Sequence, residues 1–241
     1  MEWFFAVAES EHELQNPTSP DKIRLLGQRL ELGPESLVLD VASGRAGPAV
    51  LLAGTFKCRM TCLEQAEEFH VAARERIHKA GLASQVDLVC TDARSYTLTP
   101  EHYHAALCLG ASFVWDGLEG TLAALSPAVR SGGFVAVGEP YWRIWPLPEE
   151  VDSDEGYVSL SETVGRFQAA GLVPVALIDA SLDDWDRYET LHWHTTEKWL
   201  VEHPGHPDAP AIRQHLDSDR ERYLGWQRDL LGWAIIIGRK R

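Results

Sequence analysis

The chain has 241 residues, which is long enough for one large domain with a full hydrophobic core. Its hydrophobic fraction of 45% and charged fraction of 24% are those of an ordinary globular protein. Lys and Arg total 22 against 36 Asp and Glu, a net charge of −14. This balance argues against nucleic acid or an anionic membrane surface as a partner, because both bind clustered positive charge.

The N-terminal stretch 1–9 contains a short apolar run flanked by acidic residues and has no basic leader. It therefore predicts neither a signal peptide nor a membrane span. The four cysteines fall in or beside expected strands, and the C-x-x-x-C spacing of Cys58 and Cys62 has no second pair. This arrangement predicts buried reduced thiols in a cytoplasmic protein and no zinc site.

A cap helix is expected over 10–33, where Ile23, Leu26 and Leu30 recur at helical spacing after a turn signal at 16–20. Next come the apolar strand 37–41, a loop of small residues and a second helical pattern. Small residues allow the backbone to approach a ligand closely, and the start of a helix presents unpaired N–H groups. This order predicts a nucleotide-binding α/β unit.

The loop follows the pattern Asp40-x-Ala42-x-Gly44-x-Ala46-Gly47. It does not fit the G-x-G-x-x-G spacing of dinucleotide folds, which disfavours an NAD-type oxidoreductase. It resembles the first motif of the class I S-adenosylmethionine (SAM)-dependent methyltransferases, D-x-G-x-G-x-G, with alanine in place of two glycines. The resemblance implies SAM as cofactor and S-adenosylhomocysteine (SAH) as product. The loop residues that it places at the cofactor are Asp40, Ala42, Ser43, Gly44 and Gly47.

Acidic residues follow the next two strands. The strand 57–64 ends at Glu64, whose carboxylate we expect beside the first loop, where it can accept both ribose hydroxyls, with Gln65 next to it. The third strand, 86–90, precedes Asp92 and Ala93, which the resemblance places at the adenine. The alternative for Asp92 is a cap on the following turn.

The fourth strand, 104–110, has no N-P-P-Y sequence of the kind found in amino-group methyltransferases of DNA and protein. The lack of that sequence points to a small-molecule acceptor. In the family this strand end lies under the sulfonium, so the resemblance assigns Leu109 and Gly110 to the cofactor. A fifth strand is expected at 134–138 after a turn at 130–133, so Glu139 and Tyr141 are predicted catalytic residues near the acceptor. For Tyr141 the alternative is that its ring packs an inserted loop.

The sixth and last strands are expected at 172–178 and 232–238, with an aromatic-rich helical insertion, 182–231, between them. It is predicted to be a lid over the substrate pocket. His192 and His194 do not form a metal site in this prediction, because positions i and i+2 face apart on a helix. His192 is retained as a candidate base.

Together the pattern predicts one domain, 1–241, with a Rossmann-like α/β fold. Its seven-stranded, mostly parallel sheet carries helices on both faces, with the helical lid before the last strand. The resemblance spans roughly 16–140 and implies methyl transfer from SAM to a small molecule. It also implies that the leading segment covers the SAM site, with His12 and Asn16 toward the ligand, although an amphipathic helix alone also explains that segment. A second hypothesis is an inactive SAM-binding or regulatory protein, because two loop glycines are replaced. The sequence predicts no particular oligomeric state.

Overall fold

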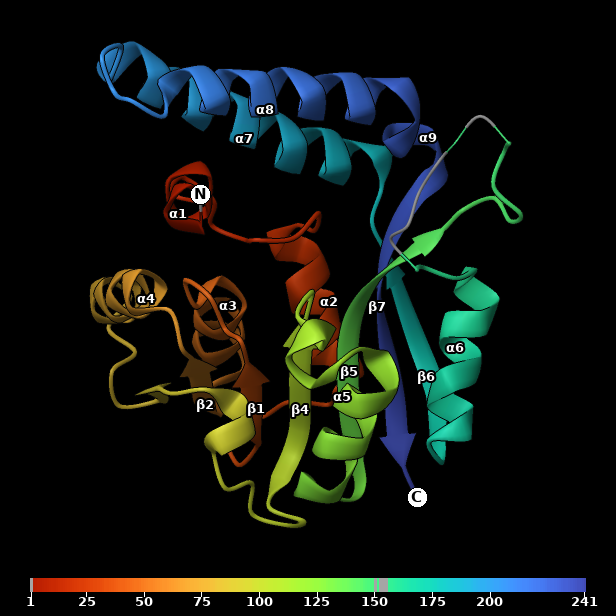
Figure 1. Cartoon of the computed structure of the whole chain (residues 1–241). Helices are drawn as coiled ribbons and strands as arrows, with labels where there is room; N and C mark the ends of the chain where they lie inside the picture. Colours follow the sequence, from red (N-terminus) through yellow and green to blue (C-terminus); the bar gives the residue numbers. More distant parts are fainter. Residues whose placement is uncertain (1, 150, 152–155) are drawn as a thin grey trace.

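The computed structural model describes residues 2–149, 151 and 156–241, and its centre is a seven-stranded sheet (Figure 1). The strands are β1 (Leu37–Val41), β2 (Arg59–Glu64), β3 (Val86–Cys90), β4 (Tyr103–Leu109), β5 (Val129–Trp142), β6 (Leu172–Asp179) and β7 (Leu231–Lys240). Their order is β3-β2-β1-β4-β5-β7-β6. β7 is antiparallel to both of its neighbours, and the other pairings are parallel. The predicted fold class is confirmed.

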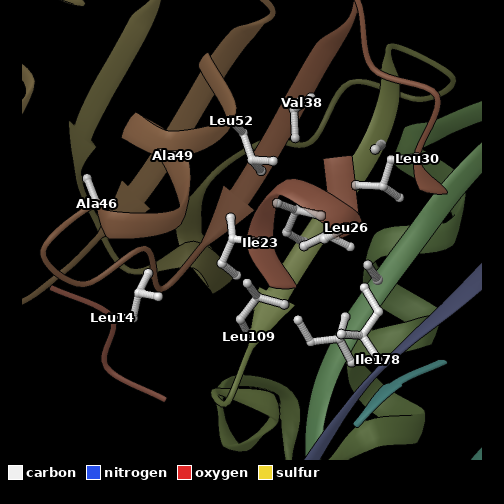
Figure 2. Close-up of a cluster of buried hydrophobic side chains, with 14 of the residues drawn as sticks. Leu14, Ile23, Leu26, Leu30, Val38, Ala46, Ala49, Leu52, Leu109 and Ile178 are labelled. Atoms are coloured by element: carbon white, nitrogen blue, oxygen red, sulfur yellow. The ribbon is translucent and has the colours of Figure 1, made fainter. Parts of the chain in front are cut away.

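Helices cover both faces of the sheet, as the apolar composition of the central strands requires. Every residue of β4 is buried. One face carries α2 (Pro20–Arg29), α3 (Gly47–Phe56) and α4 (Glu67–Lys79), and the other carries α5 (Leu118–Leu125) and α6 (Leu160–Ala169). Figure 2 shows Ile23 and Leu26 of α2, with Leu30 just after it, beside Val38 of β1 and Leu52 of α3.

A helical cap lies across the carboxyl ends of the strands. It consists of α1 (Glu2–Ala8), α7 (Leu182–Glu202), α8 (Ala209–Arg222), a π-helical turn (Tyr223–Gln227) and α9 (Arg228–Leu230). α7 and α8 pack side by side, and α1 lies between this pair and the sheet (Figure 1). Phe4 of α1 is buried in a small apolar cluster with α7 and α8. Residues from opposite ends of the sequence therefore build the cap together.

The cap is tied to α2 at the start of α7. Ser181 and Asp184 form a reciprocal capping box, and the Asp184 carboxylate also binds Lys22 Nζ. The guanidinium of Arg187 contacts the other Asp184 oxygen at 2.7 Å. Burial alone would raise the pKa of Asp184, but the hydrogen bonds from Lys22, Ser181 and Arg187 outweigh it and hold the pKa well below its usual range. This contact fixes α7 over the sheet.

The N-terminal part differs from the helix expected at 10–33. The helix begins only at Pro20, where Ser19 accepts a hydrogen bond from the Lys22 N–H, and residues 9–19 form turns and bends. An additional helix, α1, precedes them. None of the helices in the described ranges is both long and apolar enough to cross a membrane.

The fifth strand is longer than predicted at both ends. β5 runs from Val129 to Trp142 because it pairs with β7 up to Trp142 and Leu231. The residues that follow position 138 thus continue a strand instead of entering a loop. This changes the location of two predicted catalytic residues.

Candidate functional site

The loop after β1 has the backbone conformation that glycine favours. Its residues Ala42, Gly44 and Ala46 have φ angles of 51°, 54° and 57°. For a residue with a Cβ, the left-handed region costs about 1–2 kcal/mol. Both alanines therefore adopt the conformation of the glycines they replace, at a cost in stability. Ala46, the N-cap residue of α3, has no side-chain acceptor, so within the described residues no capping side chain binds the first N–H groups of this helix.

Glu64, at the end of β2, is held rigidly against this loop. Its Oε2 accepts the Gly44 N–H and its Oε1 accepts the Ala66 N–H, each at 2.8 Å. The side chain is buried. Each carboxylate oxygen keeps a further lone pair, so Glu64 can accept hydroxyl groups of a ligand without giving up these bonds.

Asp40 lies buried beside Glu64. Burial, together with the nearby Glu64 charge, raises the pKa of Asp40 to about 7. Its Oδ2 has no hydrogen-bond partner among the described residues. A buried carboxyl oxygen without a partner is costly, which fits a site that a polar or cationic ligand completes.

Asp92 follows β3 and also caps the turn after it, which is the alternative role considered from the sequence. Its carboxylate accepts the Arg94 N–H at 2.9 Å and pairs with the Arg94 guanidinium at 2.8 Å. These bonds lower the pKa of Asp92. A ligand amine at this carboxylate has to share it with Arg94.

All eleven predicted cofactor residues lie around one cavity of about 340 Å³ at the carboxyl ends of the strands. They are Asp40, Ala42, Ser43, Gly44, Gly47, Glu64, Gln65, Asp92, Ala93, Leu109 and Gly110. A cavity of this size suits a small-molecule ligand. The structure thus brings together residues from four strand ends that lie far apart in the sequence.

The N-terminal segment closes one side of this cavity. The side-chain oxygen of Gln15 accepts the Arg45 N–H at 2.7 Å, and the Asn16 amide donates to the Leu109 carbonyl at 3.0 Å. A Cβ at Gly44 would lie 2.1 Å from Gln15 Oε1, and one at Gly110 would lie 2.1 Å from Asn16 Oδ1. Both glycines therefore permit a close approach of this segment. The sequence indicated Asn16 but missed Phe5, Glu13 and Gln15, which also line the cavity.

Two of the predicted catalytic residues, Glu139 and Tyr141, lie away from this cavity. Within the described part of the chain, neither Glu139 nor Tyr141 lines this cavity. Glu139 is buried in β5, and burial raises its pKa to about 7, opposed by Ser112 and Arg166. The Tyr141 hydroxyl donates to Asp179 Oδ1 at 2.8 Å, and burial together with this partner raises the pKa of Tyr141 to about 12. The physical reason is that β5 continues past both residues, so they are inside the sheet.

His192 lines a second cavity, of about 450 Å³, between α1, α7 and α8. Its other lining residues are Phe4, Phe5, Ala8, Tyr188, Glu189, Trp193, Thr196, His215, Leu216, Asp219, Arg222 and Gln227. Phe5 borders both cavities. The second cavity thus lies inside the cap and meets the first at Phe5.

Comparison with known proteins agrees with this geometry. The model of a family described as "Methyltransferase domain" matches residues 38–133. A SAM-dependent methyltransferase from Geobacter sulfurreducens, solved in complex with SAH, is 31% identical. Its TM-score is 0.93, over 100% of this chain and 99% of that one. A SAM-dependent methyltransferase from Thiobacillus denitrificans, also solved with SAH, is 32% identical with a TM-score of 0.92, over 99% and 98% of the two chains.

A further relative covers almost the whole sequence. The uncharacterized protein YjhP of Escherichia coli is 30% identical over 238 residues, 96% of each chain. The order of the strands, the loop after β1 and the acidic strand ends agree with these similarities. The chain therefore belongs to the class I SAM-dependent methyltransferases, a family of enzymes that use SAM as the methyl donor.

Proposed function

We propose that this protein transfers the methyl group of SAM to a small molecule held within the helical cap. The observation that carries the proposal is the convergence of the eleven predicted cofactor residues on one cavity, next to a second cavity that shares Phe5 with it. Bound SAM supplies an activated methyl group on a sulfonium whose leaving group is neutral. The protein has to hold the acceptor in line with that group and exclude water.

The residues of the first cavity suit the parts of SAM. Glu64 is fixed by two backbone N–H groups and has lone pairs left for ribose hydroxyls. Asp92 and Ala93 lie where the adenine is expected, and Asp40 offers an unpartnered oxygen. Leu109 and Gly110 line the side next to Asn16. The donor and acceptor groups present therefore fit this cofactor.

The second cavity is the proposed acceptor site. Its walls combine aromatic side chains such as Phe4 and Trp193 with the polar groups of His192 and Arg222. Of the three catalytic candidates, only His192 lines one of the two cavities described above, the one that shares Phe5 with the cofactor cavity. We therefore assign the acceptor-facing role to His192, and structural roles to Glu139 and Tyr141. The net charge of −14 supports a small molecule over nucleic acid.

Calorimetric titration with SAM and SAH tests the cofactor cavity. Glu64→Gln should weaken both affinities by more than about tenfold, because the amide turns an N–H toward one of the two backbone donors and removes an acceptor from the ligand. Glu68→Gln makes the same charge change at an exposed position on α4 that is not part of the cavity lining described above, and should leave both affinities unchanged. Equal affinities for the two variants would contradict the assignment of Glu64.

Transfer of a labelled methyl group from SAM tests the acceptor class. The protein is incubated with the small-molecule fraction of a cell extract and, separately, with its macromolecular fraction. We expect label to appear only in the small-molecule fraction, and His192→Gln to reduce the rate more than it reduces SAM affinity. Label in macromolecules would refute the small-molecule acceptor. Tight SAM binding without transfer to either fraction would favour the inactive, SAM-binding alternative.

A further inference from the structure

Three potential metal ligands from distant parts of the sequence meet under the cap. Glu9 and His12 belong to the segment after α1, and His192 belongs to α7. One ligand atom from each residue lies within 4.8 Å of the other two. The Glu9 side chain is 0% exposed, that of His12 is 2% exposed and that of His192 is 20% exposed. A charged carboxylate at such depth requires strong partners.

The hydrogen bonds of this cluster leave His12 Nδ1 and Glu9 Oε2 facing each other, and neither atom receives a hydrogen bond from the described residues. His12 Nε2 lies 3.0 Å from the Tyr188 carbonyl oxygen, so this nitrogen carries the proton and donates. A neutral imidazole carries one proton, so with the proton on Nε2 the other nitrogen, Nδ1, has a lone pair. His12 Nδ1 lies 3.5 Å from Glu9 Oε2. Neither atom has a hydrogen-bond partner among the described residues.

The other Glu9 oxygen is fully used. Oε1 accepts the Tyr188 hydroxyl at 3.1 Å and lies 2.7 Å from His192 Nε2. Glu9 Oε2 and His12 Nδ1 are both buried hydrogen-bond acceptors without a donor. Buried polar groups in native proteins rarely lack a hydrogen-bond partner. A cation between these two atoms would satisfy both. The arrangement therefore calls for a positively charged occupant that the protein chain itself does not supply there.

We propose that Glu9, His12 and His192 bind a divalent metal ion of the zinc type through Glu9 Oε2, His12 Nδ1 and His192 Nε2. Two imidazoles and one carboxylate form a ligand set that zinc accepts in sites with three protein ligands and one open position. The Tyr188 carbonyl fixes the tautomer of His12 that directs Nδ1 to the metal, as outer partners of metal ligands commonly do. Binding would displace the proton that His192 Nε2 shares with Glu9.

The open side of the site faces the proposed acceptor. His192 is the most exposed of the three ligands, and it lines the second cavity together with Tyr188 and Glu189. A fourth ligand would come from that cavity, so an acceptor with a hydroxyl, thiol or amine group can complete the coordination. The metal would also join α7 to the segment whose next residues, Gln15 and Asn16, close the first cavity.

This site differs from the metal-free prediction made from the sequence. His192 and His194 were rejected there as a pair because they face apart, and His194 is indeed exposed. The partners of His192 come from the opposite end of the chain, a pairing that only the folded cap reveals. Metal binding at this site does not depend on the proposed methyl transfer.

Titration of the chelator-treated full chain with Zn²⁺, and with Co²⁺ as a visible spectroscopic probe, tests the proposal. We expect one ion per chain, a rise in Tm with Zn²⁺ and Co²⁺ absorption bands typical of a low-coordinate site. His12→Gln and His192→Gln should each weaken binding by at least about 100-fold, since loss of a ligand exceeds loss of an outer partner. The control His194→Gln, two residues from His192 on the exposed side, should bind as wild type does.

Two outcomes would overturn the proposal. One is the absence of stoichiometric binding at micromolar Zn²⁺, which would mean that a proton, not a metal, lies between Glu9 and His12. The other is binding that His12→Gln and His192→Gln leave unchanged, which would mean adventitious binding at surface histidines. Circular dichroism of each variant shows whether it is folded, and SAH titration of the same samples reports separately on the cofactor cavity.

Discussion

The cofactor side and the cap of this protein are built in different ways. On the cofactor side, each functional residue belongs to a strand end or the loop after it, and regular parallel pairing brings the ends together. In the cap, α1 and the residue after it meet α7 and α8 across most of the sequence, through the apolar cluster around Phe4 and the contact of Glu9 with His192. Local sequence patterns mark the residues of the cofactor side, whereas the contacts of the cap depend on long-range packing. This difference determines what can be predicted and which mutations are most informative.

The largest expected effect is at the joint between the two regions. Asp184→Asn should destabilise the protein by about 3 kcal/mol, because it leaves Lys22 and Arg187 without their buried carboxylate. Chemical denaturation measures this. The stabilisation that the ionised Asp184 carboxylate gives the wild-type protein should be complete above the ordinary Asp pKa of 3.8. It should be lost as the pH falls below that value, because the pKa of Asp184 is lowered in the folded state.

Asp183→Asn is the matched control for that joint. Asp183 is 92% exposed and its nearest contact with Arg187 is 3.7 Å, so its removal should cost under about 0.5 kcal/mol. If the two variants lose equal stability, the cap is held to the sheet by its apolar contacts and not by the Asp184 cluster.

The second prediction concerns Glu139, which the sequence assigned to the acceptor site and the structure buries in the sheet. Its pKa is raised from 4.5 to about 7, so the folded state keeps a proton that the unfolded state has lost. The stabilisation from this proton is lost as the pH rises through about 7. Relative to Glu139→Gln, the wild type should therefore lose about 2–3 kcal/mol between about pH 5 and 8.

Denaturation of both proteins at several pH values checks this expectation for Glu139. Parallel stability curves would show that the carboxyl group is hydrated, as it would be in an acceptor site. A collapse of methyl transfer in Glu139→Gln without a change in SAM affinity would return Glu139 to the catalytic machinery.

The third prediction addresses the contact of the N-terminal segment with the cofactor loop. Gly110 and Gly171 have nearly the same φ, 80° and 78°, but a Cβ at Gly110 meets Asn16 whereas one at Gly171 has open space. Gly171→Ala should cost about 1 kcal/mol from backbone strain alone. Gly110→Ala should cost about 1 kcal/mol more and weaken SAH binding. Equal costs and unchanged SAH affinity would show that the segment moves aside easily.

The smallest effect is expected inside the loop after β1. Ala42 is partly exposed and has a φ of 51°, so Ala42→Gly should relieve strain at little loss of packing. After subtraction of the greater freedom of glycine in the unfolded chain, we expect a stabilisation of about 0.5 kcal/mol. Thermal unfolding measures it. Destabilisation would mean that the methyl group of Ala42 contributes more by packing than its backbone conformation costs.

Much of the cofactor side could be predicted from the sequence, because its signals are local. Small residues at 42–47 and single acids such as Glu64 stand directly after apolar strands, and parallel pairing brings them to one edge. The error at β5 arose because its length is set by pairing with β7, about ninety residues away, and not by its own pattern. That pairing carries Glu139 and Tyr141 into the sheet.

The cap could be predicted only as helices. The insertion at 182–231 has clear helical periodicity, and the structure has α7 and α8 there. Phe5 and Gln15 lack any local pattern that marks them as cavity residues, and Glu9 becomes notable only beside His192. Contacts of this kind depend on how the completed chain packs. A single sequence does not contain them as motifs.

The position of β7 has a consequence for biosynthesis. β7 follows every other strand in the sequence, yet it lies between β5 and β6 and pairs with both. Until residues 231–240 have left the ribosome, β6 has no partner strand, and its apolar side chains Leu172 and Ile178, which are buried in the folded protein, have no sheet to join. Translation that stops before residue 231 would leave a vacant place inside the sheet, with two unpaired strand edges open to aggregation.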